Sequence, residues 1–158
     1  MIFRPRTQKW LRIPCLFVAL RVLVPLSNGA DATPPKIAGG QIQAIYRVQV
    51  ARDGHLLESV VAAIRQNNIQ DGAVLMGIGS LQECAYHRSK SLGPDNADEF
   101  YTVKGAMELL NLDGTITGGK PHLHITFSNE KGAFGGHLDD CRVLRGVELV
   151  IAKFSALR

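Results

Sequence analysis

Apolar and polar residues alternate along the first part of the folded region. Every second residue from 42 to 50 is apolar, which is typical of a strand with one buried face. Asp53-Gly54 predicts a turn after this strand. Apolar residues then recur at helical spacing between residues 56 and 64, and Asn67-Asn68 follows as an end signal. The pattern therefore predicts a strand, a turn and one helix.

The remainder of the chain consists of short apolar or alternating segments separated by turns. Residues 73–78 form an apolar run suited to a buried strand, and Gly77 and Gly79 indicate a bend in it. Further strands are predicted at residues 81–88, 100–104, 107–116, 121–128, 132–137 and 147–154. One main helix with many strands predicts a single α+β domain built on a mostly antiparallel, curved sheet. A single helix covers only part of such a sheet, so we expect self-association.

The N-terminal residues differ from the rest in composition. Residues 1–32 combine a basic start, an apolar stretch at 13–26 and small residues at Ala30-Asp31-Ala32, the layout of a secretory signal peptide. Arg21 and Pro25 interrupt the stretch, and the alternative is a wrongly chosen start codon. The stretch is too short and broken for a stable membrane span. We predict an exported or periplasmic protein if this leader is a true signal peptide, and a cytoplasmic one otherwise.

A linker is predicted after the leader. Residues 33–40 contain Pro34-Pro35 and Gly39-Gly40, so the domain is expected to cover residues 41–158. Cys84 and Cys141 lie in this domain. A disulfide is conceivable in an oxidising compartment, but nothing in the sequence places the two residues side by side. We interpret them as two buried thiols.

The excess of basic residues belongs to the leader. The chain has 18 basic and 14 acidic residues, a formal net charge of +4. The first 32 residues hold five of the basic and one of the acidic residues, so the remainder carries 13 of each. Duplex DNA binding depends largely on basic side chains that neutralise phosphates. A neutral domain therefore gives no general reason to expect a DNA-binding surface.

The histidines offer the clearest candidate chemistry. The strict alternation of residues 121–128 places His122 and His124 on one face of a strand. If Glu130-Lys131 forms the centre of the following turn, His124 lies opposite His137 on the next strand. Directly opposed side chains point to the same side of a sheet. All three imidazoles are then expected to converge, unless a bulge at Gly135-Gly136 turns His137 away.

Three histidines with one open position form an established zinc site. The alternative is a polar face without a metal, and His55 and His87 are interpreted as surface histidines. Glu108 and Glu148 interrupt apolar strand patterns. Each could orient a histidine, bind the metal, act as a base, meet an arginine or simply face solvent.

An ordered series of motifs resembles the PPC (plants and prokaryotes conserved) domain over nearly all of residues 41–156. The resemblance implies a mixed α/β fold, a trimer and, in prokaryotic members, a metal position at His122, His124 and His137. It also carries a description as DNA-binding, which comes from plant members with an adjacent AT-hook. The motifs are Gly54 with Leu56-Leu57, Gly77-Ile78-Gly79-Ser80-Leu81, residues 107–116, His122-Leu123-His124 and Gly135-Gly136-His137-Leu138.

This chain lacks an Arg-Gly-Arg-Pro hook, and its Arg4-Pro5-Arg6 has no glycine. We therefore expect a zinc-binding, non-catalytic oligomeric module that binds a ligand or partner. The alternatives are a DNA-binding regulator and a metal-dependent hydrolase that uses the three-histidine site.

Overall fold

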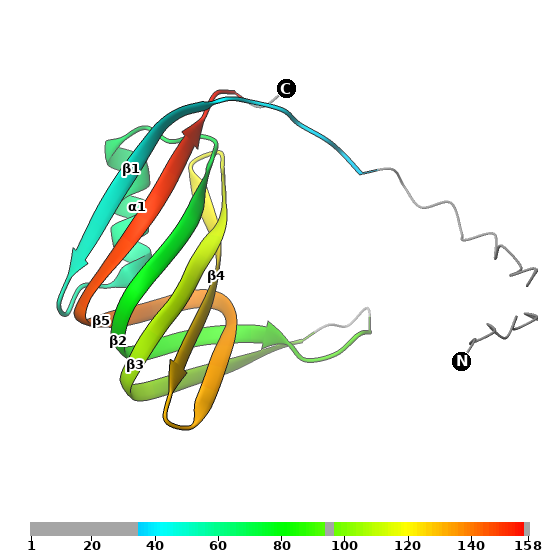
Figure 1. The fold of residues 1–158 in the computed structure, drawn as a ribbon. Coiled ribbons are helices and arrows are strands. Elements are labelled where there is room, and N and C mark those ends of the chain that lie inside the picture. Colours follow the sequence, from blue (N-terminus) through cyan, green and yellow to red (C-terminus); the bar gives the residue numbers. More distant parts are fainter. Residues whose placement is uncertain (1–34, 94–96, 157–158) are drawn as a thin grey trace, which may run out of the picture. The chain divides into compact units, whose positions relative to one another are not determined.

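The computed structural model describes residues 35–93 and 97–156, and Figure 1 shows their arrangement. The predicted leader, residues 1–32, lies outside the described residues. Ile37–Arg158 form a compact unit, which contains every helix and strand of the described residues. The elements, in chain order, are β1 (Ile42–Ala51), α1 (Leu56–Gln66), β2 (Gly72–Ser89), β3 (Asp98–Thr117), β4 (Lys120–Asn129) and β5 (Gly132–Phe154).

The first strand and the helix follow the predicted pattern. In β1 the polar face is exposed while Val50 enters the core. Helix α1 buries Leu56, Val60 and Ile64 along one stripe, as a 3.6-residue period requires. At the helix start, the Asp140 side chain on β5 accepts a hydrogen bond from the Leu57 amide at 3.1 Å. A distant strand thus satisfies one of the amides that a helix N-terminus leaves without an intrahelical partner.

The predicted short strands join into long bent ones. Residues 73–78 and 81–88 are parts of β2, residues 100–104 and 107–116 are parts of β3, and residues 132–137 and 147–154 are parts of β5. The β2–β3 register shifts between Leu81 and Glu83, and Gly79 has φ 149°. Such irregularities bend a strand without ending it. The sequence signals taken as strand ends are therefore bends within continuous strands.

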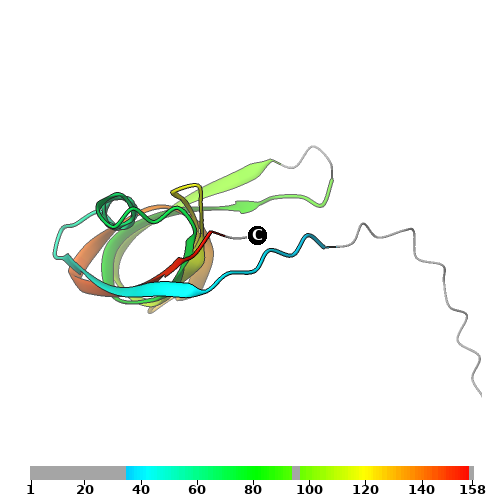
Figure 2. The ribbon, with the colours of Figure 1, turned by 90° about the horizontal axis from the view of Figure 1, so that it is seen from above.

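The sheet curls because β5 changes neighbours along its length. Its later part lies between β1 and β2, whereas its first residues pair with β4. The strand order is β1-β5-β2-β3-β4. In addition, β4 at the end of this order pairs with β5, so the sheet curls back on itself. All these pairings are antiparallel, which confirms a mostly antiparallel sheet with a single helix. Seen from above, the strands enclose a rounded interior with α1 beside it (Figure 2).

The interior is filled by side chains from all parts of the sheet. Phe127, Leu112 and Leu149 are fully buried, together with the helix residues Leu56 and Val60. No helix among the described residues is long and apolar enough to cross a membrane.

The interpretation of Cys84 and Cys141 as two thiols is wrong in this structure. The two residues face each other on β2 and β5 and form a disulfide. Both are buried. The two cysteines are 57 residues apart in sequence. The β2–β5 register that aligns them includes shifts on both sides of Leu81. The spacing of the cysteines in the sequence does not predict this register.

Candidate metal centre

The hairpin of β4 and β5 has the predicted register. Asn129 Oδ1 accepts a hydrogen bond from the Lys131 amide at 2.8 Å, which closes the turn. Ser128 lies opposite Ala133, and His124 lies opposite His137. The prediction that His124 and His137 are cross-strand partners is confirmed.

Two glycines in this hairpin allow close packing rather than a bulge. No register shift occurs between β4 and β5. A Cβ at Gly135 would lie 2.6 Å from the Ile125 carbonyl oxygen, and a Cβ at Gly136 would lie 2.4 Å from the His87 carbonyl oxygen. Any larger side chain would push a neighbouring strand away. The glycines thus keep β5 close to β4 on one side and to β2 on the other, with His137 at the next position.

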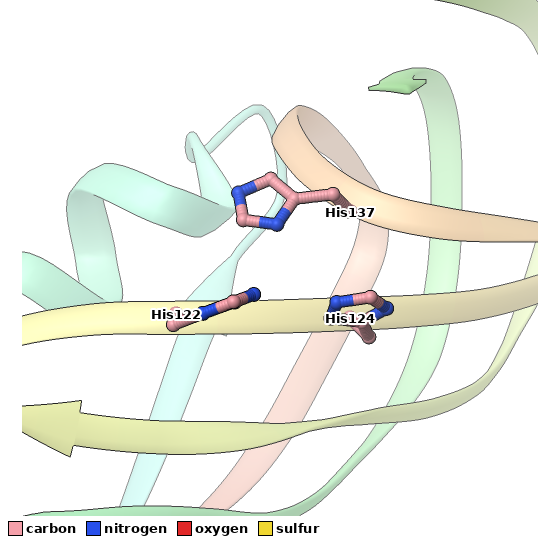
Figure 3. Close-up of side chains that lie close together, drawn as sticks. All are labelled: His122, His124 and His137. Carbon is pink, nitrogen blue, oxygen red and sulfur yellow. The ribbon is translucent and has the colours of Figure 1, made fainter. Parts of the chain in front are cut away.

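The three predicted histidines gather on the outer side of the sheet. His122 and His124 lie side by side on β4, and His137 reaches from β5 toward the same spot (Figure 3). Their ring centroids are 4.8 Å apart for His122 and His137 and 5.5 Å apart for His124 and His137. One nitrogen of each ring lies within 4.8 Å of the others. The arrangement brings three imidazole nitrogens close to one point.

His137 differs from the other two in its surroundings. His122 and His124 are exposed, whereas His137 is half-buried. Burial, followed by the nearby imidazoles of His87, His122 and His124, lowers the pKa of His137 from its ordinary value. A lowered pKa keeps this imidazole neutral, which is the form that binds metal ions.

His87 is not the isolated surface histidine that its sequence context indicated. It lies on β2 directly opposite His137, with ring centroids 4.5 Å apart. Its Nδ1 atom is 2.7 Å from Asp139 Oδ1. His87, His124 and His137 line a common cavity of about 240 Å³. The β2–β5 pairing that creates this proximity is remote in sequence, so no local pattern could have revealed it.

The two predicted carboxylates are not brought to the histidines. Glu108 and Glu148 line a separate cavity of about 810 Å³, next to Gly79 and Gly146. Glu148 accepts a hydrogen bond from Arg47 at 2.7 Å, which lowers the pKa of Glu148 and raises that of Arg47. None of the three histidines lines that cavity, and of the alternatives for Glu148 the pairing with an arginine is the one observed. The register places another carboxylate, Asp113 on β3, opposite His124, and the sequence analysis did not single it out.

Comparison with known families and curated proteins gives a consistent assignment. The model of the Plants and Prokaryotes Conserved (PCC) domain matches residues 37–155. Two Synechococcus proteins named bifunctional protein GlmU are also similar. One, from strain JA-3-3Ab, is 25% identical over 127 residues, which is 79% of this chain and 19% of that protein. The other, from strain JA-2-3B'a(2-13), is 28% identical over 110 residues, which is 68% of this chain and 16% of that protein. The chain thus spans less than a fifth of the length of either relative.

Solved structures share the fold at low sequence identity. A plant- and prokaryote-conserved protein from Pyrococcus horikoshii has a TM-score of 0.65 and 24% identity, covering 75% of this chain and 83% of its own. A metal-containing protein from Archaeoglobus fulgidus has a TM-score of 0.66 and 14% identity, covering 77% and 86%. A protein from Bacteroides thetaiotaomicron that is named as a suspected DNA-binding protein has a TM-score of 0.61 and 22% identity, covering 77% and 86%.

Proposed function

The chain belongs to the Plants and Prokaryotes Conserved domain family, abbreviated PCC or PPC, and on this premise we propose that it is a non-catalytic, oligomeric metal-binding module. In this proposal, His122, His124 and His137 hold one zinc ion or a similar divalent cation. The ion offers a remaining position at which an oxygen or nitrogen atom of a ligand or partner can bind.

The observation that carries the proposal is the convergence of three imidazoles. Nitrogens of a tetrahedral zinc site lie ~2.1 Å from the ion and hence roughly 3.4 Å from one another. The nitrogens here lie within 4.8 Å of one another. Small rotations of the rings can close this difference. None of the three rings makes a hydrogen bond to another described residue that would occupy a nitrogen. The similar fold of a metal-containing protein from Archaeoglobus fulgidus also supports the proposal.

The position of the carboxylates favours binding over hydrolysis. A metal-dependent hydrolase needs a base within hydrogen-bond reach of the water that it activates. Glu108 and Glu148, the candidate bases, line a different cavity, and Glu148 is paired with Arg47. Asp113, opposite His124, accepts a hydrogen bond from Asn111 Nδ2 at 3.1 Å. We therefore rank the hydrolase alternative below a ligand-binding role.

Metal analysis of protein purified without chelator tests the proposal. We expect about one zinc-like ion per chain, because three ligands define one site. His124→Ala leaves two imidazoles, so binding should weaken by at least roughly 100-fold. Thr126→Ala is the matched control, since Thr126 is exposed on the same strand and two residues from His124. Less than about one ion per three chains, or binding that survives His124→Ala, would reject a site built on this set.

An exposed apolar surface supports self-association. Ile78 on β2 and Leu110 on the neighbouring strand β3 are 48% and 50% exposed. Water-exposed apolar groups on neighbouring strands favour coverage by another surface. We propose that copies of this chain cover it in a trimer, as the family resemblance implies. Sedimentation at micromolar concentration should show trimers that Ile78→Glu weakens, while Leu92→Glu, in a loop, should not. A monomeric wild-type protein would contradict this.

A DNA-binding role is the second candidate, because a protein of similar fold is named for it. The equal numbers of basic and acidic residues beyond residue 32 weigh against it. We expect duplex affinity at physiological salt of ~10⁻⁴ to 10⁻⁶ M, the non-specific range. Sequence-selective binding in the nanomolar range would reverse this ranking.

Export remains a proposal that the disulfide supports. Disulfides persist in oxidising compartments and are rare in the cytosol. The Cys84–Cys141 bond is therefore compatible with a leader that directs the chain out of the cytoplasm. N-terminal sequencing of the mature protein should start near Asp31 or Thr33. An intact Met1 on the cytoplasmic protein would exclude export.

A further inference from the structure

A fourth histidine continues the row that contains two of the three candidate ligands. His137 on β5 lies directly between His87 on β2 and His124 on β4. Directly opposed residues of a sheet point to the same side. The ring of His137 is therefore flanked by one imidazole on each side. His124 is a member of the three-histidine cluster, whereas His87 is not.

His87 is held firmly by groups outside the cluster. Its Nδ1 atom is 2.7 Å from Asp139 Oδ1, and its Nε2 atom is 4.0 Å from Asp98 Oδ2. The Phe100 ring lies against it, with centroids 5.0 Å apart at 42°. Only 21% of the His87 side chain is exposed. A side chain with a fixed hydrogen bond and an aromatic neighbour has little rotamer freedom.

The contact between His87 and His137 restricts the second ring. Their centroids are 4.5 Å apart and their planes differ by 33°, so the rings pack against each other at a tilt. His137 has no hydrogen bond to a described residue that would fix its orientation. Metal affinity depends on the neighbours that orient a ligand as well as on the ligand itself.

We propose that His87, anchored by Asp139, is a positioning residue of the candidate metal centre. Its ring packs against His137 at a tilt and holds that imidazole in the orientation that faces His122 and His124. The predicted effect of His87 on metal affinity rests on the proposed function. The restraint of the His137 ring by His87 can be measured in the metal-free protein.

Two substitutions of His87 distinguish the role of its flat ring from the role of its ring nitrogens. His87→Ala removes the stacking surface, and zinc affinity measured by competition should fall roughly 10- to 100-fold. His87→Phe keeps a flat ring without nitrogens and should restore affinity to within about threefold of wild type. In cobalt-loaded protein, the visible absorption bands should change with alanine and return with phenylalanine. His55→Ala is the control, since His55 is paired with Asp140 and lies outside the row.

The outcomes separate the two proposals. If wild-type protein binds metal and His87→Ala binds equally well, the positioning role is wrong and the proposed function stands. Equal losses in the alanine and phenylalanine variants, with wild-type affinity in Asp139→Ala, would also overturn it, because a nitrogen of His87 would then be required for something other than its anchoring by Asp139. If wild-type protein binds no metal, the proposed function fails. NMR of the metal-free protein then decides the restraint: the side-chain couplings of His137 should indicate one rotamer in wild type and an average over several in His87→Ala, and unchanged couplings would overturn it.

Discussion

The two edges of β5 arise from very different distances along the chain. One edge, at residues 132–137, pairs with β4 across a turn centred on Glu130-Lys131. The other, at residues 137–153, pairs with β2, whose Cys84 is 57 residues from its partner Cys141. Turn geometry fixes the register of the first pairing. The second register results from the closure of the whole sheet, with several shifts along it.

The two edges also differ in what they contribute. The local edge brings together His124 and His137, which the alternation and the turn already predict. The remote edge supplies the Cys84–Cys141 bond and the His87–His137 contact. The candidate ligands are thus positioned by a hairpin, while the structure that supports them depends on tertiary pairing. Disturbing each edge separately should show whether this division holds.

The largest expected effect comes from the remote edge. Replacing both Cys84 and Cys141 by alanine opens a loop of 57 residues. Chain-entropy arguments give a loss of roughly 4 kcal/mol in the free energy of unfolding for a loop of this length. Denaturant unfolding of the double variant measures this loss. Zinc affinity of the folded fraction should change little, because the β4–β5 hairpin does not contain the bond.

Reduction of the wild-type protein is the matched comparison for this variant. It breaks the same bond without removing the two sulfur atoms from the core, where both cysteines are buried. A similar loss of stability on reduction would assign the effect to the cross-link. Equal stability of oxidised and reduced protein would show that β2 and β5 stay paired without it.

A smaller effect is expected when one methyl group is added at either edge. Gly135→Ala places a Cβ 2.6 Å from the Ile125 carbonyl oxygen on β4, and Gly136→Ala places one 2.4 Å from the His87 carbonyl oxygen on β2. Each contact involves backbone, so a strand must shift, at a cost of about 1–3 kcal/mol in the free energy of unfolding. Gly39→Ala is the control, because nothing lies within 4 Å of its added Cβ.

The two glycine variants should differ in metal binding. Gly135→Ala separates the strands that carry His124 and His137, so it should reduce zinc affinity more than Gly136→Ala does. Zinc competition on both purified variants gives the comparison. A greater loss in Gly136→Ala would show that the remote edge, rather than the hairpin, determines the site.

The sequence predicted those features that depend on neighbours in the chain. The helix, the direction of the β4 side chains and the His124–His137 register were predicted correctly, because each follows from a local period or turn. The breaks assigned at Gly79 and near residue 105 are bends within β2 and β3, since a bulge and a strand end share the same glycine signal. Glu108 and Glu148 each interrupt an apolar strand pattern, and this pattern does not show whether the side chain faces the histidines, an arginine or solvent. Only the tertiary pairing shows that Glu148 meets Arg47.

The smallest expected effect concerns the end of the remote edge, where Asp140 of β5 meets His55 before α1. The hydrogen bond and charge of Asp140 raise the pKa of His55 from its ordinary value. A raised folded-state pKa means that protonated His55 stabilises the fold fully below the unfolded-state pKa of ~6.5. This contribution is lost as the pH rises through the folded-state pKa.

His137 has a lowered pKa, so its contribution to the free energy of unfolding changes with pH in the opposite direction. Only the difference between wild type and His55→Gln therefore isolates the His55–Asp140 pair. Urea unfolding across this pH range should show a small advantage of wild type at acidic pH that shrinks as the pH rises and with added salt, since His55 is exposed. An advantage that grows with pH would have the wrong sign for a protonated His55 paired with Asp140.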